Sequence, residues 1–335
     1  MKVAVVGAGS MGGMHADLLG AMDEVSDLFV VDADPGRAEE VARRNGGSAV
    51  EFEQAVRVAD AIIVSTPPEL HAAEVEAAAD AGRHVLCEKP LTDALATSIE
   101  LTRRIEAAGT HVEVGFQRRH DAGFVAAREA ATGRLHLVRL TAHDPLVRPQ
   151  PPASGPAPEI APIFRDSSIH DFDVVRWLSG QEVTEVSVEA GRRDGIRPSD
   201  PREIESAIVS MRLSAGTLAV LEASWLHPAG YDIRIELVAE GAATTGGLSP
   251  RTPARHSDWS EPVDPWTGYL ERFEPAYRAE LVAFLACCRG IRPPVSSARD
   301  GLEAMRIAVA ATRSFSDGRR VALDEIDGLP RREVA

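Results

Sequence analysis

The sequence of 335 residues is poor in cysteine, in aromatic side chains and in positive charge. Its three cysteines, Cys87, Cys287 and Cys288, are too few for a disulfide framework and lack the C-x-x-C spacing of a metal site. We expect the adjacent pair Cys287 and Cys288, on a predicted helix, to be small buried thiols rather than a redox couple. Nowhere do about 18 apolar residues follow one another, so no membrane-spanning helix is predicted.

Acidic residues outnumber basic ones, 51 to 36, which gives a formal net charge of −15. This balance argues against a general nucleic-acid surface or an anionic-membrane surface. The hydrophobic share of 44% and charged share of 26% are those of an ordinary globular protein. The length favours two domains of roughly 150 residues each. Residues 1–7 lead directly into a strand without a signal-peptide pattern, so we expect a cytoplasmic protein.

A glycine pattern follows the first apolar strand, residues 3–6. The stretch Gly7-Ala8-Gly9-Ser10-Met11-Gly12 matches G-x-G-x-x-G and leads into a predicted helix that reaches Leu19. In this pattern Gly7 makes the tight turn, Gly9 lets the backbone approach a pyrophosphate, and Gly12 lets the helix pack on the strand. Free N–H groups at the helix N-terminus then hold the anion. We therefore predict that Gly7, Gly9, Ser10, Met11 and Gly12 bind a dinucleotide.

An acid ends the second predicted strand, residues 28–31. Asp32 lies about 20 residues after Gly12, where the ribose-binding carboxylate of this pattern belongs. A carboxylate there accepts hydrogen bonds from ribose hydroxyls and repels a 2′-phosphate, and Asp34 adds to that repulsion. We therefore predict NAD as the cofactor rather than NADP. Arg37, at the start of the next helix, is either a phosphate contact or a solvated side chain.

Strands and helices go on alternating through the first 118 residues. Further strands are predicted at 61–65, 83–87 and 111–114, and alanine-rich helices at 69–79 and 93–107. Alternation of this kind predicts an α/β Rossmann domain with a doubly wound parallel sheet over residues 1–118.

Two strand ends carry further candidates for the cofactor site, because ligands of such sheets collect at the carboxyl ends of the strands. Thr66 and Pro67 follow one strand, and His71 is either a plain helix-start residue or a cofactor contact. Glu88 and Lys89 follow another, before the helix-starting Pro90. Lys89 would hold its ammonium over the cleft between cofactor and substrate; the alternative is that both are solvated turn residues.

The second half, residues 119–335, changes character. A helix at 122–131 and a strand at 135–142 lead to His143-Asp144-Pro145 and then to a proline-rich segment, 148–162, which we interpret as a stiff functional cover. Alternating stretches at 185–189, 207–213, 217–225 and 231–239 predict a large open, mostly antiparallel sheet covered by helices on one face. Helices at 275–288 and 300–314 follow. The uncovered face commonly pairs with another subunit, so we expect a homo-oligomer.

A second chemical cluster follows the proline-rich segment. Asp166, His170, Asp173 and Trp177 recur at helical spacing and are predicted to share one face. A carboxylate one turn from an imidazole suits general acid–base chemistry. The alternatives are that Asp166 caps the helix and that His170 is a satisfied interior histidine. No third ligand for a zinc ion is evident, so no metal is predicted.

Taken together, these motifs resemble the glucose–fructose oxidoreductase/inositol dehydrogenase (Gfo/Idh/MocA) family along nearly the whole chain. The marks are Gly7 to Gly12, Thr66 to His71, Cys87 to Pro90, Gly115 to Arg119, Asp166 to Asp173, and Arg272 to Tyr277 with Glu280. The inositol 2-dehydrogenase branch is the most similar in look, through residues 164–166 and 169–178.

The resemblance implies a Rossmann domain followed by a substrate-binding and oligomerisation α/β domain, often in a dimer or tetramer. It also implies a catalytic group of Lys89, Asp166 and His170, with substrate contacts from these three and from Arg118, His143 and Tyr277. Two departures affect the substrate region. Ala161 and Pro162 replace the two glycines usual in that branch, and His143 stands where arginine is common.

We expect an NAD(P)-dependent oxidoreductase that acts on a CH–OH group, a secondary alcohol of a cyclic polyol or sugar, with no nucleic-acid or membrane partner. His170 would accept the hydroxyl proton, Lys89 would stabilise charge on the reacting oxygen, and Asp166 would position His170 or a substrate hydroxyl. Two alternatives stay open. One is an NAD-dependent glycosidase that works by transient oxidation and elimination; the other is a non-catalytic regulator that binds NAD and a sugar.

Overall fold

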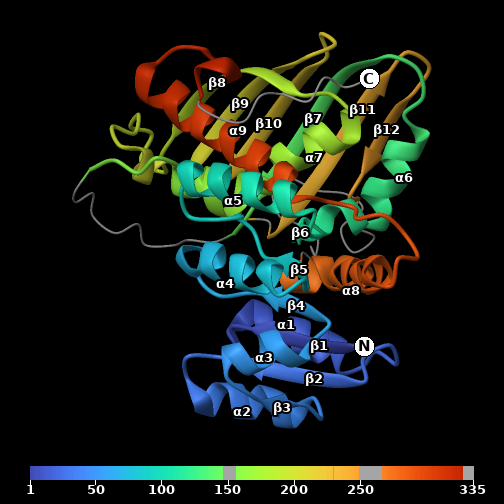
Figure 1. The fold of residues 1–335 in the computed structure, drawn as a ribbon. Coiled ribbons are helices and arrows are strands. Elements are labelled where there is room, and N and C mark those ends of the chain that lie inside the picture. Colours follow the sequence, from blue (N-terminus) through green and yellow to red (C-terminus); the bar gives the residue numbers. More distant parts are fainter. Residues whose placement is uncertain (146–155, 229, 249–265, 327–335) are drawn as a thin grey trace. The chain divides into compact units, whose positions relative to one another are not determined.

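The computed structural model describes residues 1–145, 156–228, 230–248 and 266–326. These residues form two compact units (Figure 1). The first contains residues 1–116 and 277–303, and the second contains residues 117–276 and 304–326 within the described ranges. We keep the predicted domain division after residue 118 as a proposal. Of the proline-rich segment, residues 148–155 lie outside the described residues.

The first unit is built on a six-stranded parallel sheet in the order β3-β2-β1-β4-β5-β6. This order is that of the doubly wound dinucleotide-binding fold, so the predicted Rossmann domain is confirmed. Its strands are β1 (Lys2–Val6), β2 (Asp27–Val31), β3 (Ser48–Ala49), β4 (Ala61–Val64), β5 (His84–Cys87) and β6 (Val112–Val114). Buried apolar residues fill the central strands, because helices cover both faces of a parallel sheet.

The helices of this unit begin and end where local chemistry favours it. They are α1 (Ser10–Leu19), α2 (Pro35–Arg44), α3 (Phe52–Val58), α4 (Pro68–Asp80) and α5 (Leu95–Ala108). In α2, Asp34 caps the N-terminus, Pro35 takes the first position, and Arg43 and Arg44 lie in the last turn near the negative end of the helix dipole. Gly109 ends α5 with φ +67°, in the left-handed region that glycine adopts without strain.

The second unit is built on a seven-stranded sheet in the order β12-β11-β7-β10-β9-β8-β13. Its strands are β7 (Leu135–His143), β8 (Val183–Gly191), β9 (Ser206–Leu213), β10 (Leu218–Ser224), β11 (Asp232–Ala239), β12 (Ala243–Gly246) and β13 (Val321–Ala322). Adjacent strands are antiparallel except for β7 and β10, which are parallel. The predicted mostly antiparallel sheet is thereby confirmed, and its edge strands β12 and β13 are additional to the predicted ones.

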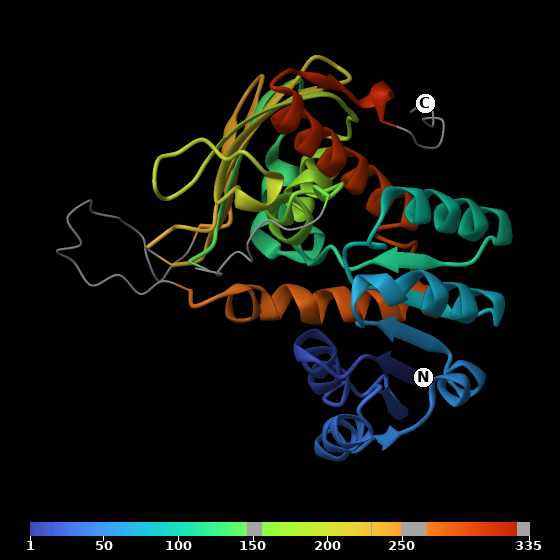
Figure 2. The same ribbon diagram turned by 90° about the vertical axis from the view of Figure 1, so that its left-hand side faces the viewer.

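Helices cover one face of this sheet. Along β9, buried residues such as Val209 and Met211 alternate with exposed ones such as Ile208 and Arg212. Figure 2 shows α9 in red along one face of the sheet. The remaining helices are α6 (Ala122–Ala130), α7 (Ile169–Ser179), α8 (Tyr269–Cys288) and α9 (Ala298–Asp317). Helix α8 begins earlier than predicted and contains Pro275 in its first turns.

Candidate active site

The glycine loop joins β1 to α1 at the point where the strand order reverses, between β1 and β4. Gly7 has φ +89°, and a Cβ there would lie 2.7 Å from the backbone oxygen of Ser65. At Gly12 a Cβ would lie only 1.7 Å from the backbone oxygen of Gly7. Both positions therefore require glycine for the turn and for the close packing of α1 on β1.

Gly9 is different. A Cβ at this position would meet nothing within 4 Å, so packing within the protein does not explain the glycine. Gly9 and Ser10 are exposed and Met11 is half-buried, where the N–H groups of α1 begin. An exposed glycine at a helix N-terminus leaves room for a pyrophosphate to approach the backbone. The loop thus fits NAD.

Asp32 is built into the same loop. Its Oδ2 accepts a hydrogen bond from the Ala8 amide at 2.7 Å, and its Oδ1 accepts one from the Asp34 amide at 2.8 Å. Each oxygen keeps a further lone pair for a ribose hydroxyl. Arg37 lies 3.6 Å from Asp32, and Asp34 is committed to capping α2. Of the two carboxylates Asp32 and Asp34, Asp32 is therefore the one that fits a ribose.

At the end of β4, Thr66 is half-buried and Pro67 is exposed. The Thr66 hydroxyl donates to Glu74 at 2.5 Å. His71 is buried in α4, with Nδ1 2.9 Å from the Pro90 oxygen and Nε2 2.9 Å from the Thr66 oxygen. Both ring nitrogens therefore face backbone carbonyls, and His71 connects the loops that follow β4 and β5. A direct contact between His71 and the cofactor stays a prediction.

Glu88, directly after β5, is buried at 7% exposure. The alternative of a solvated turn is therefore wrong for Glu88. Its Oε1 lies 2.8 Å from His15 Nε2, on α1, and the backbone amide of Lys89 lies 3.3 Å from Oε2. Burial alone would raise the pKa of Glu88, but the hydrogen bond from His15 and the charges of His15 and Lys89 hold that pKa below its ordinary value. Lys89 itself is half-buried.

A second carboxyl group of the first unit, Glu280 on α8, is 2% exposed. Both of its oxygens are buried without a hydrogen-bond partner in the described part of the chain. Burial and the negative charges of Glu88 and Glu113 raise the pKa of Glu280 well above its ordinary value. Glu280 therefore keeps its proton to a higher pH than an ordinary glutamate. Nearby on α8, Tyr277 is buried, and its ring packs edge-on against His15 with centroids 6.0 Å apart.

In the second unit, Asp166 and His170 do not belong to one regular helix. Residues Phe164–Ser168 form a π-helical turn, and α7 begins after it at Ile169. The prediction of one regular helix over both residues is therefore wrong, because a π-helical turn pairs backbone groups five residues apart rather than four. The Asp166 carboxylate accepts two hydrogen bonds from Arg165, at 2.8 and 3.2 Å. His170 lies buried in the first turn of α7.

Two adjacent arginines anchor α7. Arg118 is 2% exposed and donates to Asp171 at 2.5 Å, and Arg119 forms a bidentate pair with Asp173. Asp171 is the residue next to His170. Burial raises the pKa of Asp171, against the effect of the Arg118 charge. Arg118 thus serves to hold α7, and its predicted contact with substrate stays a prediction.

His143, the last residue of β7, lies on the sheet face that α7 does not cover. The alternate residues Val138, Leu140 and Ala142 are buried, and α7 packs on this strand. On the other face His143 is 3.0 Å from Glu222, and its ring stacks on His227 with centroids 4.3 Å apart. Burial and the nearby His227 lower the pKa of His143. The contacts of His143 in the described residues are thus with Glu222 and His227, and its predicted contact with substrate stays a prediction.

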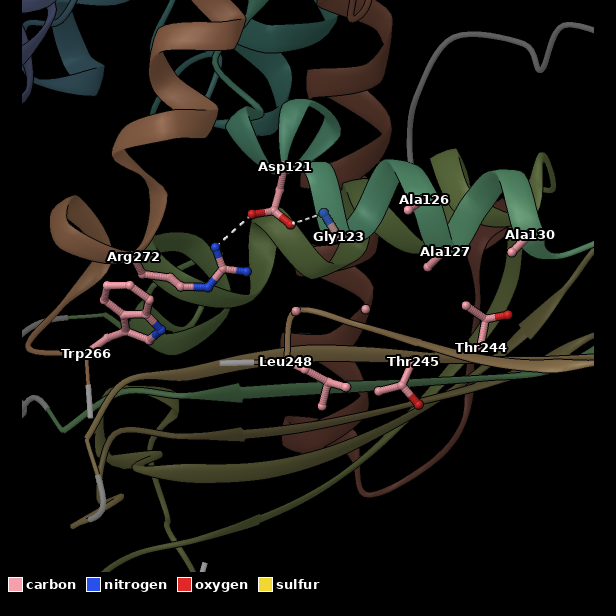
Figure 3. Close-up of a pocket in the computed structure, with 12 residues that line it drawn as sticks. Asp121, Gly123, Ala126, Ala127, Ala130, Thr244, Thr245, Leu248, Trp266 and Arg272 are labelled. Atoms are coloured by element: carbon pink, nitrogen blue, oxygen red, sulfur yellow. Dashed lines mark hydrogen bonds and ion pairs between the residues drawn. The ribbon is translucent and has the colours of Figure 1, made fainter. Parts of the chain in front are cut away.

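A pocket of about 510 Å³ lies between α6 and β12 in the second unit (Figure 3). Asp121 caps α6 there and pairs with Arg272 at 2.7 Å. Alanines of α6, two threonines of β12, Leu248 and Trp266 complete the wall. None of the predicted site residues lines this pocket. Within the described residues, no group of three or more His, Cys, Asp or Glu side chains is arranged to hold a metal ion, and no helix is long and apolar enough to cross a membrane.

Comparison with known proteins assigns both halves of the chain. Residues 1–116 match the model of the GFO_IDH_MocA oxidoreductase family, NAD-binding Rossmann fold, and residues 139–323 match the C-terminal alpha/beta domain of the same family. The chain belongs to the Gfo/Idh/MocA oxidoreductase family. The resemblance seen in the sequence is thereby confirmed.

Named members of the Gfo/Idh/MocA family are similar over the full length. Myo-inositol dehydrogenase Hyg17 of Streptomyces leeuwenhoekii is 35% identical over 95% of this chain and 98% of that protein. Myo-inositol 2-dehydrogenase of Thermotoga maritima is 29% identical over 98% of this chain and 100% of that protein. The structure of a myo-inositol dehydrogenase from Lactobacillus casei, in complex with NAD(H) and myo-inositol, superposes with a TM-score of 0.84 at 25% identity and covers 98% of each chain.

The predicted reaction class, an NAD(P)-dependent oxidoreductase acting on a CH–OH group, and the predicted cofactor NAD are confirmed by this membership. Two buried polar residues of the first unit, His15 and Glu280, were not among the predicted site residues. The sequence does carry a signal for His15, because it is the one polar side chain among the apolar or small residues on the buried face of α1. Glu280 was noted as a family mark only, because a lone glutamate on a helix carries no sign of burial.

We predict that replacing Asp32 by Ala narrows the preference for NAD over NADP. Hydrogen bonds to charged groups contribute about 1.5–3 kcal/mol, so the ratio of kcat/KM values should fall by about 10- to 100-fold. Steady-state kinetics with both cofactors measure this ratio. If the wild-type enzyme prefers NADP, Arg37 rather than Asp32 determines the cofactor preference.

We also predict that Glu280→Gln stabilises the protein increasingly as pH rises. The pKa of Glu280 in the folded state lies above its ordinary value of 4.5, so the folded protein binds an extra proton above that pH. Wild-type stability therefore falls there, relative to the variant, by up to about 1.4 kcal/mol per pH unit. Urea unfolding between pH 4 and 8 measures the difference. Glu129→Gln, at an exposed position of α6, is the control. If the difference in free energy of unfolding between wild type and Glu280→Gln does not change with pH, the raised pKa of Glu280 is contradicted.

Proposed function

We propose that this chain is an NAD-dependent dehydrogenase that oxidises a secondary alcohol of an inositol-like cyclic polyol or sugar. The observation that carries the proposal is full-length similarity: a myo-inositol dehydrogenase is 35% identical over 95% of this chain. The similarity spans both the cofactor unit and the unit that would bind substrate.

The glycine loop and Asp32 would hold the cofactor. Gly9, Ser10 and Met11 offer the open N-terminus of α1 to the pyrophosphate, and Asp32 offers lone pairs to the ribose. Thr66, Pro67 and His71 are proposed to shape the edge of the site after β4, and Glu88 the edge after β5. Bound NAD supplies the hydride acceptor of the reaction.

Three side chains are proposed to handle the substrate's proton and charge. His170 takes the proton of the reacting hydroxyl as general base, since imidazole titrates near neutral pH. Lys89 donates a hydrogen bond to the reacting oxygen and stabilises the charge that develops on it. Asp166 positions His170 or a substrate hydroxyl. The half-buried position of Lys89 at the end of β5 and the buried position of His170 in α7 support these roles.

Recognition of the polyol rests on fewer residues. We propose Tyr277 and Arg118 as further substrate contacts, although Arg118 already spends one donor on Asp171. His143 is supported less, because its ring lies with Glu222 and His227 on the sheet face opposite α7. Ala161, whose amide donates to Thr312, is fully buried, so it shapes the segment before the π-helical turn.

The exposed face of the seven-stranded sheet supports a proposed homodimer or homotetramer. Ile208 and Leu218 are about half exposed on it, at 47% and 48%. Apolar side chains exposed on a sheet face gain free energy when a second subunit covers them. We further propose a cytoplasmic location, because NAD and a small polyol are available there.

A panel of inositol isomers and sugars tests the function. Purified protein is incubated with NAD and each compound, and NADH is followed by its absorbance. We expect turnover with at least one inositol and no turnover without it. Release of a sugar from a glycoside without net NADH would assign the chain to the glycosidase alternative. Binding of NAD and sugar with no turnover of any compound would assign it to the regulator alternative.

For His170 we predict a pH effect with a defined sign. The base must be neutral, and an unperturbed imidazole has a pKa of about 6.5. In the oxidation direction kcat/KM should therefore fall as pH drops through the folded-state pKa. Asp171 and Asp173 are paired with arginines, which reduces their pull on a proton at His170. His170→Ala should remove this acidic limb and about 10²- to 10⁴-fold of the rate.

Exposed His136, on β7, provides the matched control for this pH profile. His136→Ala should keep both the limb and the rate. If His170→Ala keeps them as well, the base lies elsewhere.

A further inference from the structure

A buried polar group beneath the end of β5 has no part in the proposed chemistry. His15 is fully buried on α1, and its Nε2 lies 2.8 Å from Oε1 of Glu88, itself buried. A buried carboxylate without a partner costs free energy, and His15 Nε2 is the side-chain partner of Glu88 Oε1. Two elements distant in sequence are thus joined by one hydrogen bond.

Glu88 is also fixed by its surroundings. Its amide donates to the Val64 oxygen at 2.8 Å, which extends the pairing of β5 with β4 by one residue. Gly115 leaves space for its carboxylate, since a Cβ there would lie 3.3 Å from three carboxylate atoms of Glu88. The Lys89 amide lies 3.3 Å from Oε2. The peptide that leads into Lys89 is therefore held from both sides.

The same helix carries the glycine-loop N-terminus. His15 follows Ser10, the first residue of α1, by little more than one turn. A shift of α1 would therefore move His15, and with it the Glu88 carboxylate and the start of Lys89. Glu88 directly precedes Lys89, and both its amide and its carboxylate are held, so the backbone from which the Lys89 side chain projects is restrained.

We propose that His15, acting through Glu88, is a positioning residue for Lys89 and couples the cofactor-binding helix to the lysine of the reaction. The inference rests on the proposed function, in which Lys89 stabilises charge on the reacting oxygen. Without His15 the buried Glu88 carboxylate loses its hydrogen bond and must take a proton or move. Either change removes the restraint on the peptide between Glu88 and Lys89. Misplacement of a catalytic group by about 1 Å costs about 10²-fold in rate.

The first arm of the test replaces His15 by Leu and measures kcat and the dissociation constant of NAD separately. We expect kcat to fall by about 10²-fold while NAD binding changes little. His15→Gln, which keeps an amide donor, should recover part of the loss. His84→Leu is the matched control, since it removes a histidine from the other end of β5 and should keep kcat. Equal losses of kcat in His15→Leu and His84→Leu would show that His15 only supports packing around β5 and does not position Lys89.

The second arm is a double-mutant cycle with Lys89→Met. Lys89→Met alone should lower turnover of the best inositol by about 10²- to 10³-fold. If His15 acts through Lys89, His15→Leu should cost little more in the Lys89→Met enzyme. If the two losses multiply, the positioning role is overturned while the proposed function stands.

If Lys89→Met keeps wild-type turnover, the proposed function of Lys89 fails first, and the inference fails with it. Circular dichroism and NAD binding report whether each variant folds. Should His15→Leu not fold, the cycle is run with His15→Asn, whose shorter amide does not reach Glu88, and with His15→Gln as the rescue.

Discussion

A single buried carboxylate at the end of β5 constrains the cofactor unit. Glu88 is 7% exposed and ionised, and an ion in a protein interior must be paired. His15 on α1 supplies the hydrogen bond, and Gly115 at the end of β6 supplies the space. Breaking such a buried pair costs about 3–5 kcal/mol. The glycine loop, the lysine-bearing strand end and β6 are therefore held in one arrangement by the need to keep this charge satisfied.

In the second unit, the buried charges of α7 are also paired. Nearly every residue of this helix is buried, including two aspartates, so it has no polar face to orient it toward water. Arg118 and Arg119 meet Asp171 and Asp173 instead. Apolar packing alone tolerates small rotations of a helix, whereas two neighbouring ion pairs fix its rotation. His170, at the start of α7, takes its direction from these pairs, and the neighbouring Asp171 and Asp173 are each paired with an arginine.

Membership of the Gfo/Idh/MocA family establishes the reaction class and the cofactor, and the local geometry agrees with both. Gly9 is open although no packing demands a glycine there, which is understandable if a pyrophosphate approaches it. In the predicted substrate region, His143 stands where arginine is common in the similar branch of the family. His143 is buried at 7% exposure and forms a small cluster with Glu222 and His227.

The sequence alone determined the parallel sheet, the glycine loop, Asp32 and the mostly antiparallel second sheet. Periodicity, glycine positions and strand ends are local signals, and the covered and exposed faces follow from them. The short strands β3, β12 and β13 escaped prediction because two to four residues give no period. Only the tertiary structure decided that Asp166 lies in a π-helical turn and that His143 lies opposite α7. It alone also showed that Glu88 is buried against His15, which is 73 residues away in sequence. Burial and pairing of a charge depend on partners distant along the chain, and no local pattern encodes them.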